Sequence, residues 1–167
     1  MCISQFINKI SLLLRFSDEV PVSESPLLIQ PLLQVATICE RVISEADGTV
    51  SLIRIIDRFT VGGQSEEMPA ALLQFQVVVL FRSGNYRGRL ELSLATHDPD
   101  MRVVSQVKFP LDFEGDAERG NNTVAAVNMQ VNKEGLYWII VSLAESECTR
   151  IPLRVVYQKQ PIVLSGG

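Results

Sequence analysis

Apolar and polar residues alternate with a period of two over most of the chain after residue 33. In Arg89–Ala95, three leucines fall on one face of an extended segment while Glu91 and Ser93 fall on the other, which is typical of a half-buried strand. This pattern predicts strands at residues 34–45, 50–60, 73–82, 88–97, 102–113, 122–131, 136–144 and 150–158. Because no long helical segment separates them, we expect an all-β chain, a single β-sandwich of about eight mostly antiparallel strands.

The segment 136–144 is apolar on both faces, which predicts a central strand. Tyr137 and Trp138 follow each other in it, so their side chains are predicted to point to opposite sides of the sheet. The turn residues agree with this architecture. Asp47-Gly48 predicts a hairpin between the first two strands, and residues 61–67 and 83–88 are predicted to be loops that contain glycine.

The first 33 residues differ from the rest. Apolar residues within 1–16 recur at helical spacing, which predicts a short amphipathic helix or a disordered extension, and three prolines within 17–31 predict a linker. We therefore predict an N-terminal extension at 1–33, the sandwich at 34–158 and a tail at 159–167. No apolar run is long enough to span a membrane, and Arg15 interrupts a segment that is a poor match to a signal peptide.

The composition is that of a globular domain, 47% hydrophobic and 20% charged, with a formal net charge of −4. We expect no nucleic-acid binding, because neutralising phosphates requires a basic surface. Five arginines could form a local basic patch, although a solvated sheet face is the simpler interpretation: Arg54, Arg58, Arg82, Arg87 and Arg89. Aromatic residues make up only 7% of the chain, which disfavours a stacking platform for sugars.

The three cysteines, Cys2, Cys39 and Cys148, are odd in number and widely spaced, so they form neither a disulfide framework nor a zinc motif. A reducing cytoplasm is the simplest interpretation, which makes the predicted localisation cytoplasmic. A bridge between Cys39 and Cys148 stays open, since it depends on the distance between their Cα atoms.

Candidate chemistry is sparse. The one histidine, His97, ends a predicted strand, and neither a Gly-x-Ser-x-Gly elbow nor a phosphate or dinucleotide fingerprint is present. We therefore predict no enzyme activity, no catalytic residue and no cofactor. An acid–base pair made of Asp98 and Asp100 is a third alternative.

Acidic loops suggest calcium, whose ligands are oxygen atoms. Asp98 and Asp100 lie in one loop, and several acids lie in residues 112–118. If 88–97 and 102–113 form a hairpin, however, these loops fall at opposite ends of the sandwich. No metal site is therefore predicted, and solubilising charge is the simpler interpretation.

Four segments together resemble a family of small uncharacterised bacterial β-sandwich domains. They follow the pattern Cys-Glu-x-Val, Ser-Leu-Ile-Arg, Gly-Leu-Tyr-Trp and Ile-Pro-Leu-x-Val, at Cys39–Val42, Ser51–Arg54, Gly135–Trp138 and Ile151–Val155. The resemblance covers roughly residues 34 to 158. It implies a β-sandwich, a bacterial origin and no established activity, so it supplies no catalytic residues.

Within this pattern, Glu40 and Arg54 are predicted to form an ion pair across adjacent strands or to face a partner.

The sequence thus favours a non-enzymatic accessory or protein-interaction module whose partner is another protein, with the oligomeric state left open. The alternative is a ligand-binding module, calcium-assisted or for a small molecule, that uses the acidic loops. The predicted interaction surface joins residues 62–67 and 85–89, with Tyr86 as an anchor. Its candidate residues are Glu66, Tyr86, Arg87 and Arg89.

Overall fold

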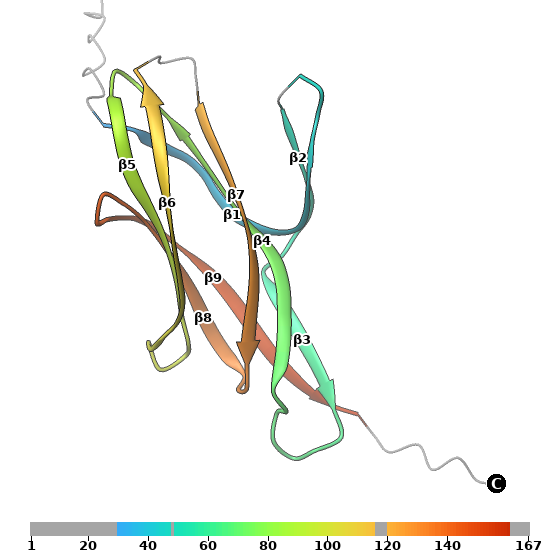
Figure 1. Cartoon of the computed structure of the whole chain (residues 1–167). Helices are drawn as coiled ribbons and strands as arrows, with labels where there is room; N and C mark the ends of the chain where they lie inside the picture. Colours follow the sequence, from blue (N-terminus) through green and yellow to red (C-terminus); the bar gives the residue numbers. More distant parts are fainter. Residues whose placement is uncertain (1–29, 48, 116–119, 161–167) are drawn as a thin grey trace, which may run out of the picture.

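The computed structural model describes residues 30–47, 49–115 and 120–160. Within them, nine strands form two sheets and no helix occurs (Figure 1). The strands are β1 (Leu32–Ser44), β2 (Val50–Ile55), β3 (Arg58–Gly63), β4 (Ala71–Arg82), β5 (Arg87–His97), β6 (Val103–Glu114), β7 (Gly120–Val131), β8 (Gly135–Leu143) and β9 (Ser146–Lys159). The four-stranded sheet has the order β2-β1-β4-β7 and the five-stranded sheet the order β3-β9-β8-β5-β6. The helix predicted near the N-terminus lies outside the described residues.

The predicted all-β sandwich is confirmed, with one correction to its strands. The segment predicted as one strand at 50–60 is two strands that belong to different sheets. The backbone of Arg54 has a positive φ of 53°, and the chain then crosses between the sheets at Ile56 and Asp57. At the crossing, Ile56 donates a hydrogen bond to Ile38 of β1, and Asp57 accepts one from Arg154 of β9.

The strand pairing is antiparallel except between β3 and β9, which run parallel. The predicted hairpins of β1 with β2 and of β5 with β6 are both present. The strand predicted to be central, now β8, lies between β9 and β5 in the middle of the five-stranded sheet.

The core lies between the inner faces of the two sheets and is mainly aliphatic. Tyr137 and Trp138 point to opposite sides of β8, as predicted. Tyr137 is buried in the core and donates a hydrogen bond of 3.0 Å to the carbonyl of Lys133, whereas Trp138 is half-buried on the outer face, opposite His97 and Pro152. The tyrosine thus places its ring in the core while its hydroxyl is satisfied at the core's edge.

The turn between β8 and β9 is tighter than the sequence indicates. Only Ala144 and Glu145 separate the two strands, and both have positive φ, 48° and 68°. Two consecutive residues in this conformation are the central pair of a type I′ turn, which normally favours Asn-Gly. The pair Ala-Glu has no such signature, so the sequence predicted a longer loop here.

Candidate functional site

The predicted interaction surface is not one surface, because its two halves lie at opposite ends of the sandwich (Figure 1). Glu66 follows β3 and pairs with Lys159 at the end of β9. Tyr86 lies between β4 and β5, beyond the far end of the twelve-residue strand β4. The two loops were predicted to form one surface, but the length of β4 separates them.

Tyr86 is also less available than an anchor residue requires. Its ring is half-buried and lies edge-on to Phe113, with 5.9 Å between the ring centroids. Beside it, Arg89 binds both carboxylate oxygens of Asp112, at 2.7 and 2.9 Å, and Arg87 donates to the carbonyl of Glu114. Tyr86 therefore closes one end of the core, and the two arginines tie β5 to β6.

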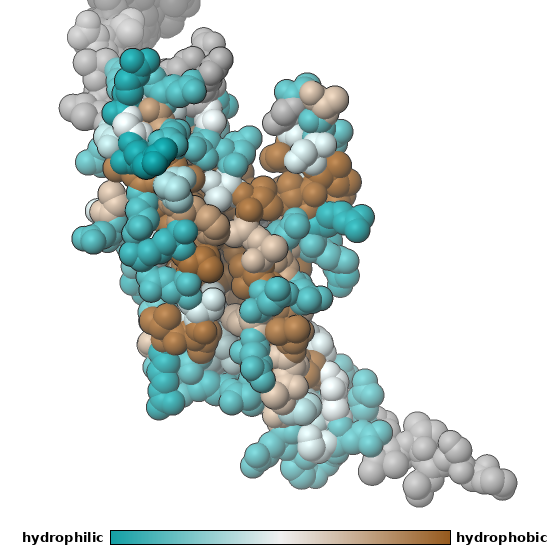
Figure 2. All heavy atoms as spheres, viewed as in Figure 1, coloured by the Kyte–Doolittle hydropathy of each residue, from teal (hydrophilic) through white to brown (hydrophobic). Residues whose placement is uncertain are grey.

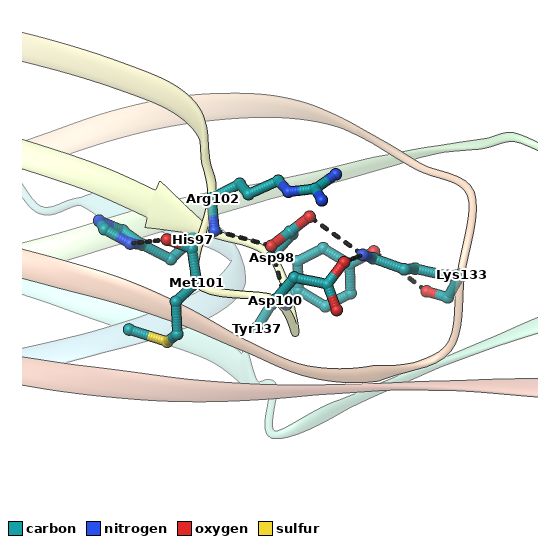
Figure 3. Close-up of polar contacts among 7 residues, drawn as sticks. All are labelled: His97, Asp98, Asp100, Met101, Arg102, Lys133 and Tyr137. Carbon is teal, nitrogen blue, oxygen red and sulfur yellow. Dashed lines mark hydrogen bonds and ion pairs between the residues drawn. The ribbon is translucent and has the colours of Figure 1, made fainter.

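The acidic turn between β5 and β6 is held by hydrogen bonds and ion pairs (Figure 3). Asp98 is buried, and its Oδ1 accepts hydrogen bonds from the backbone amides of Asp100, at 2.9 Å, and Arg102, at 2.8 Å. Its Oδ2 lies 3.1 Å from Nζ of Lys133, which also binds Asp100. Lys133 comes from the turn between β7 and β8, so the contact joins two turns at one end of the sandwich.

These contacts shift the pKa values of the charged groups. The backbone amide of Arg102, together with Lys133 and the amide of Asp100, holds the pKa of Asp98 below its usual value. Hydrogen bonds to Asp100 and then Asp98 raise the pKa of Lys133. Both groups are thus stabilised in their charged forms, which suits a structural clamp better than proton transfer near neutral pH.

The calcium alternative finds no support in this geometry. A cation at the 98–100 turn would have to displace Lys133 from the two carboxylates. The antiparallel pairing of β5 with β6 places Asp112 and Glu114 at the other end of the sandwich, as the sequence analysis expected. Within the described residues, no group of three or more His, Cys, Asp or Glu side chains is placed to hold a metal ion.

Within the described residues, the side chain of His97 makes one hydrogen bond, between Nδ1 and the carbonyl of Met101 in the same turn, at 3.3 Å (Figure 3). The two cysteines that the structure describes are free thiols: Cys39 is buried in β1 and Cys148 is exposed in β9. The bridge that the sequence left open is therefore absent. Desolvation by neighbouring atoms raises the pKa of both thiols, although Cys148 is partly open to solvent, and this makes them poorer nucleophiles near neutral pH. The cytoplasmic location stays a prediction.

The ion pair predicted between Glu40 and Arg54 is present across β1 and β2, with Arg54 Nη1 3.0 Å from Glu40 Oε2. Both side chains are largely exposed, so the pair contributes little to stability. They border a polar hollow of about 530 Å³ that opens where β1 leaves β4. Arg54 lies in β2 of the four-stranded sheet, whereas Arg89 lies in β5 of the five-stranded sheet and pairs with Asp112, so the five arginines are divided between the two sheets.

The outer face of the four-stranded sheet carries aliphatic side chains that the sequence analysis did not single out. On β4, Val77 and Val79 belong to the core, so the alternate residues Gln76 and Val78 face outward. Residues paired across antiparallel strands share a face, and Cys39 of β1 pairs with Gln76. Cys39 and Val78 therefore lie on the outer face, and both are nevertheless fully buried.

The β1–β2 hairpin continues this face. Ile55 pairs with Cys39, Ile53 pairs with Arg41, and Ile43 lies two positions beyond Arg41. Ile55 is 66% exposed, Ile53 45% and Ile43 42%. We refer to six outward aliphatic residues of this sheet as the aliphatic face: Val35, Ile43, Ile53, Ile55, Val78 and Val124. Leu32, Leu72 and Leu80 also face outward on this sheet. In Figure 2, hydrophobic atoms gather at the foot of the hairpin, beside the open space between the hairpin and the rest of the sandwich.

The same outer face is poor in charge. Among its outward positions on β1, β2, β4 and β7, only Arg41 and Arg82 are charged, and none is an acid. This contrasts with a chain whose net charge is −4. The signal in the sequence was the run Leu52–Ile56, in which Arg54 is the one polar residue, but such a run is equally typical of a buried strand.

Comparison with known proteins identifies the family. The model of a family of unknown function, DUF6941, matches residues 34–156, and the chain belongs to this family. The expected resemblance to an uncharacterised β-sandwich family is thus confirmed, while its bacterial origin stays a prediction. A search of curated proteins finds no match.

Two solved structures are similar to this chain at low identity. One is the CARDB domain of the PF1109 protein from Pyrococcus furiosus in complex with di-metal ions, with 14% identity, a TM-score of 0.38, and coverage of 75% of this chain and 90% of that chain. The other is an immunoglobulin-like protein, PA1606, from Pseudomonas aeruginosa, with 15% identity, a TM-score of 0.35, and coverage of 75% and 96%. At these scores neither supports an inference about function. In the described part of the chain, no helix has the length and apolar character needed to cross a membrane.

Proposed function

We propose that this protein is a non-enzymatic accessory module that binds another protein through the aliphatic face of its four-stranded sheet. The observation that carries the proposal is the exposure of Ile43, Ile53 and Ile55 side by side on the β1–β2 hairpin. Contiguous exposed aliphatic patches on a soluble domain mark interaction sites. Covering Ile55 alone would stabilise a complex by about 1–2 kcal/mol.

The charge of the face defines the partner's chemistry. A partner surface needs aliphatic residues to cover the three isoleucines, and a carboxylate would complement Arg41, which forms no ion pair with the described residues. The contact of Lys133 with Asp98 and Asp100, which we call the clamp, supports a non-enzymatic role, because these charged groups are already paired with each other.

The test is affinity capture from native lysate with the full-length chain and two variants, Ile55→Asp and Val103→Asp. Val103 is a matched control, because it is 57% exposed on β6 in the other sheet. We expect a stoichiometric partner whose affinity falls about tenfold or more in Ile55→Asp and is unchanged in Val103→Asp. Capture of no protein, or equal capture by both variants, would overturn the proposal.

A further inference from the structure

β7 forms one edge of the four-stranded sheet, and it is long and regular. It pairs with β4 at all twelve of its positions, from Gly120 opposite Arg82 to Val131 opposite Ala71, without a bulge. Among the residues that the structure describes, no strand pairs with its other side. An edge of this kind offers a row of main-chain groups to another strand.

The edge also lacks the features that normally prevent pairing. β7 contains no charged residue and no proline, whereas edge strands are usually protected by charges, proline, bulges or short length. The other three edges do have such features. β6 carries Lys108 and Pro110, and β2 and β3 are only six residues long.

The space beside β7 is partly open. Asn121 donates to the carbonyl of Asp112, which ties the beginning of β7 to β6. Further along, the two edges enclose a cavity of about 200 Å³ that is lined by Val107 of β6 and by residues 126–128 of β7, among others. Val107 is 39% exposed at this cavity, and Val124 on the outer face of β7 is 40% exposed, so the middle of β7 is accessible.

The sequence of β7 suits pairing with itself. When two copies run antiparallel about a two-fold axis at Ala125, each residue meets one of the same face. Asn122 then lies opposite Asn128 of the second copy and Val124 opposite Ala126, with Thr123 opposite Val127 on the inner face. No charges are opposed. Because the chain is acidic overall, a neutral strand is also where two copies approach with little repulsion.

We infer that two copies of this protein associate through β7 and join their four-stranded sheets into one continuous sheet. The β7 edge shares Val124 with the aliphatic face but includes none of the hairpin isoleucines that carry the proposed function, so the inference does not depend on that function. We expect a second copy rather than a foreign peptide at this edge, because β7 can pair with itself without opposing any charges.

The first test is sedimentation equilibrium of the full-length chain over a concentration series, with Ala126→Lys and Gln106→Lys. Ala126 is exposed at the centre of β7, while Gln106 is exposed on β6 and gives the same change of charge. We expect a reversible dimer that Ala126→Lys weakens about tenfold and Gln106→Lys leaves unchanged. A wild-type monomer up to about 1 mM, or a dimer that tolerates Ala126→Lys, overturns the inference.

A second test examines the register and does not require Ala126→Lys to fold. In a chain with serine at positions 2 and 148, the double variant Asn122→Cys/Asn128→Cys should form a disulfide-linked dimer on mild oxidation, because the two positions face each other across the axis. Asn122→Cys alone should not. Equal cross-linking of the single and double variants would exclude this register.

Discussion

Lys133 in the β7–β8 turn lies with its Nζ 3.1 Å from Oδ2 of Asp98 in the β5–β6 turn, and the Asp98 side chain is only 10% exposed. The β5–β6 turn connects two strands of the five-stranded sheet, whereas the β7–β8 turn carries the chain from the four-stranded sheet to the five-stranded sheet. Asp98 uses its other oxygen to order its own turn, so one carboxylate fixes both the turn and its neighbour.

The clamp predicts a pH dependence of stability. Because the folded pKa of Asp98 is lowered, its contribution is present above about pH 3.9 and is lost as the pH falls through the folded pKa. The pKa of Lys133 is raised in the folded state. Its contribution to stability is therefore fully present below about pH 10.4 and is lost as the pH rises through the folded pKa.

In urea unfolding, Asp98→Asn should therefore lower the midpoint between about pH 4 and pH 10 and converge with wild type in acid. A control is Glu91→Gln, which breaks the exposed pair with Lys108 and should change the midpoint little. Parallel pH profiles of wild type and Asp98→Asn would show that the clamp does not act as described.

Gly135 at the start of β8 should not tolerate a side chain. Its φ is +146°, and an added Cβ would lie 2.5 Å from Cγ of Pro99. We expect Gly135→Ala to lower the free energy of unfolding by more than about 1 kcal/mol, measured by urea denaturation. Gly62→Ala is the control, because its close contact is the flexible end of Gln160. Similar losses in both variants would contradict the assignment.

Removing the hydroxyl of Tyr137 isolates one buried hydrogen bond. Tyr137→Phe keeps the ring in the core and deletes the bond to the carbonyl of Lys133. The expected loss is about 1–2 kcal/mol of unfolding free energy, since a buried acceptor loses its donor. Thermal unfolding monitored by circular dichroism measures it, and an unchanged melting temperature would mean that water replaces the hydroxyl.

The turn between β8 and β9 offers a gain in stability. Ala144 and Glu145 both adopt positive φ, which is costly for residues with a Cβ. Ala144→Asn with Glu145→Gly supplies the pair that a type I′ turn favours and should raise the free energy of unfolding by about 1 kcal/mol. Chemical denaturation of the double variant beside each single variant checks this, and a destabilised double variant would refute it.

Much of the fold could be predicted from periodicity because inward and outward residues alternate clearly. The alternating leucines of β5 predicted a half-buried strand, and β8, which is apolar on both faces, was predicted to be central. The crossing at Ile56 and Asp57 was missed because the run from Val50 to Thr60 contains neither Gly nor Pro to mark a break between two strands. The signal available in the sequence was the pair Ile55-Ile56, where two consecutive apolar residues interrupt the alternation of inward and outward positions.

The candidate site was harder to predict. The Glu40–Arg54 pair followed from opposite charges at suitable positions. The aliphatic face did not, because the apolar pattern of a strand looks the same whether its second face meets a core, a partner or water. Only the register, which places Ile53 and Ile55 beside Arg41 and Cys39, shows that no strand or sheet of the described chain covers them.

The parallel pairing of β3 with β9 determines when the five-stranded sheet can be completed during synthesis. β3 emerges from the ribosome early, yet within the described chain Arg58 to Gly63 pair only with Arg154 to Lys159 of β9. Phe59 and Val61 of this strand pack against the core. Their sheet cannot be completed until the C-terminal part of the chain has been synthesised. A chain that stops short of β9 loses its final strand and also leaves β3 without a neighbour, which exposes a nascent edge to other chains.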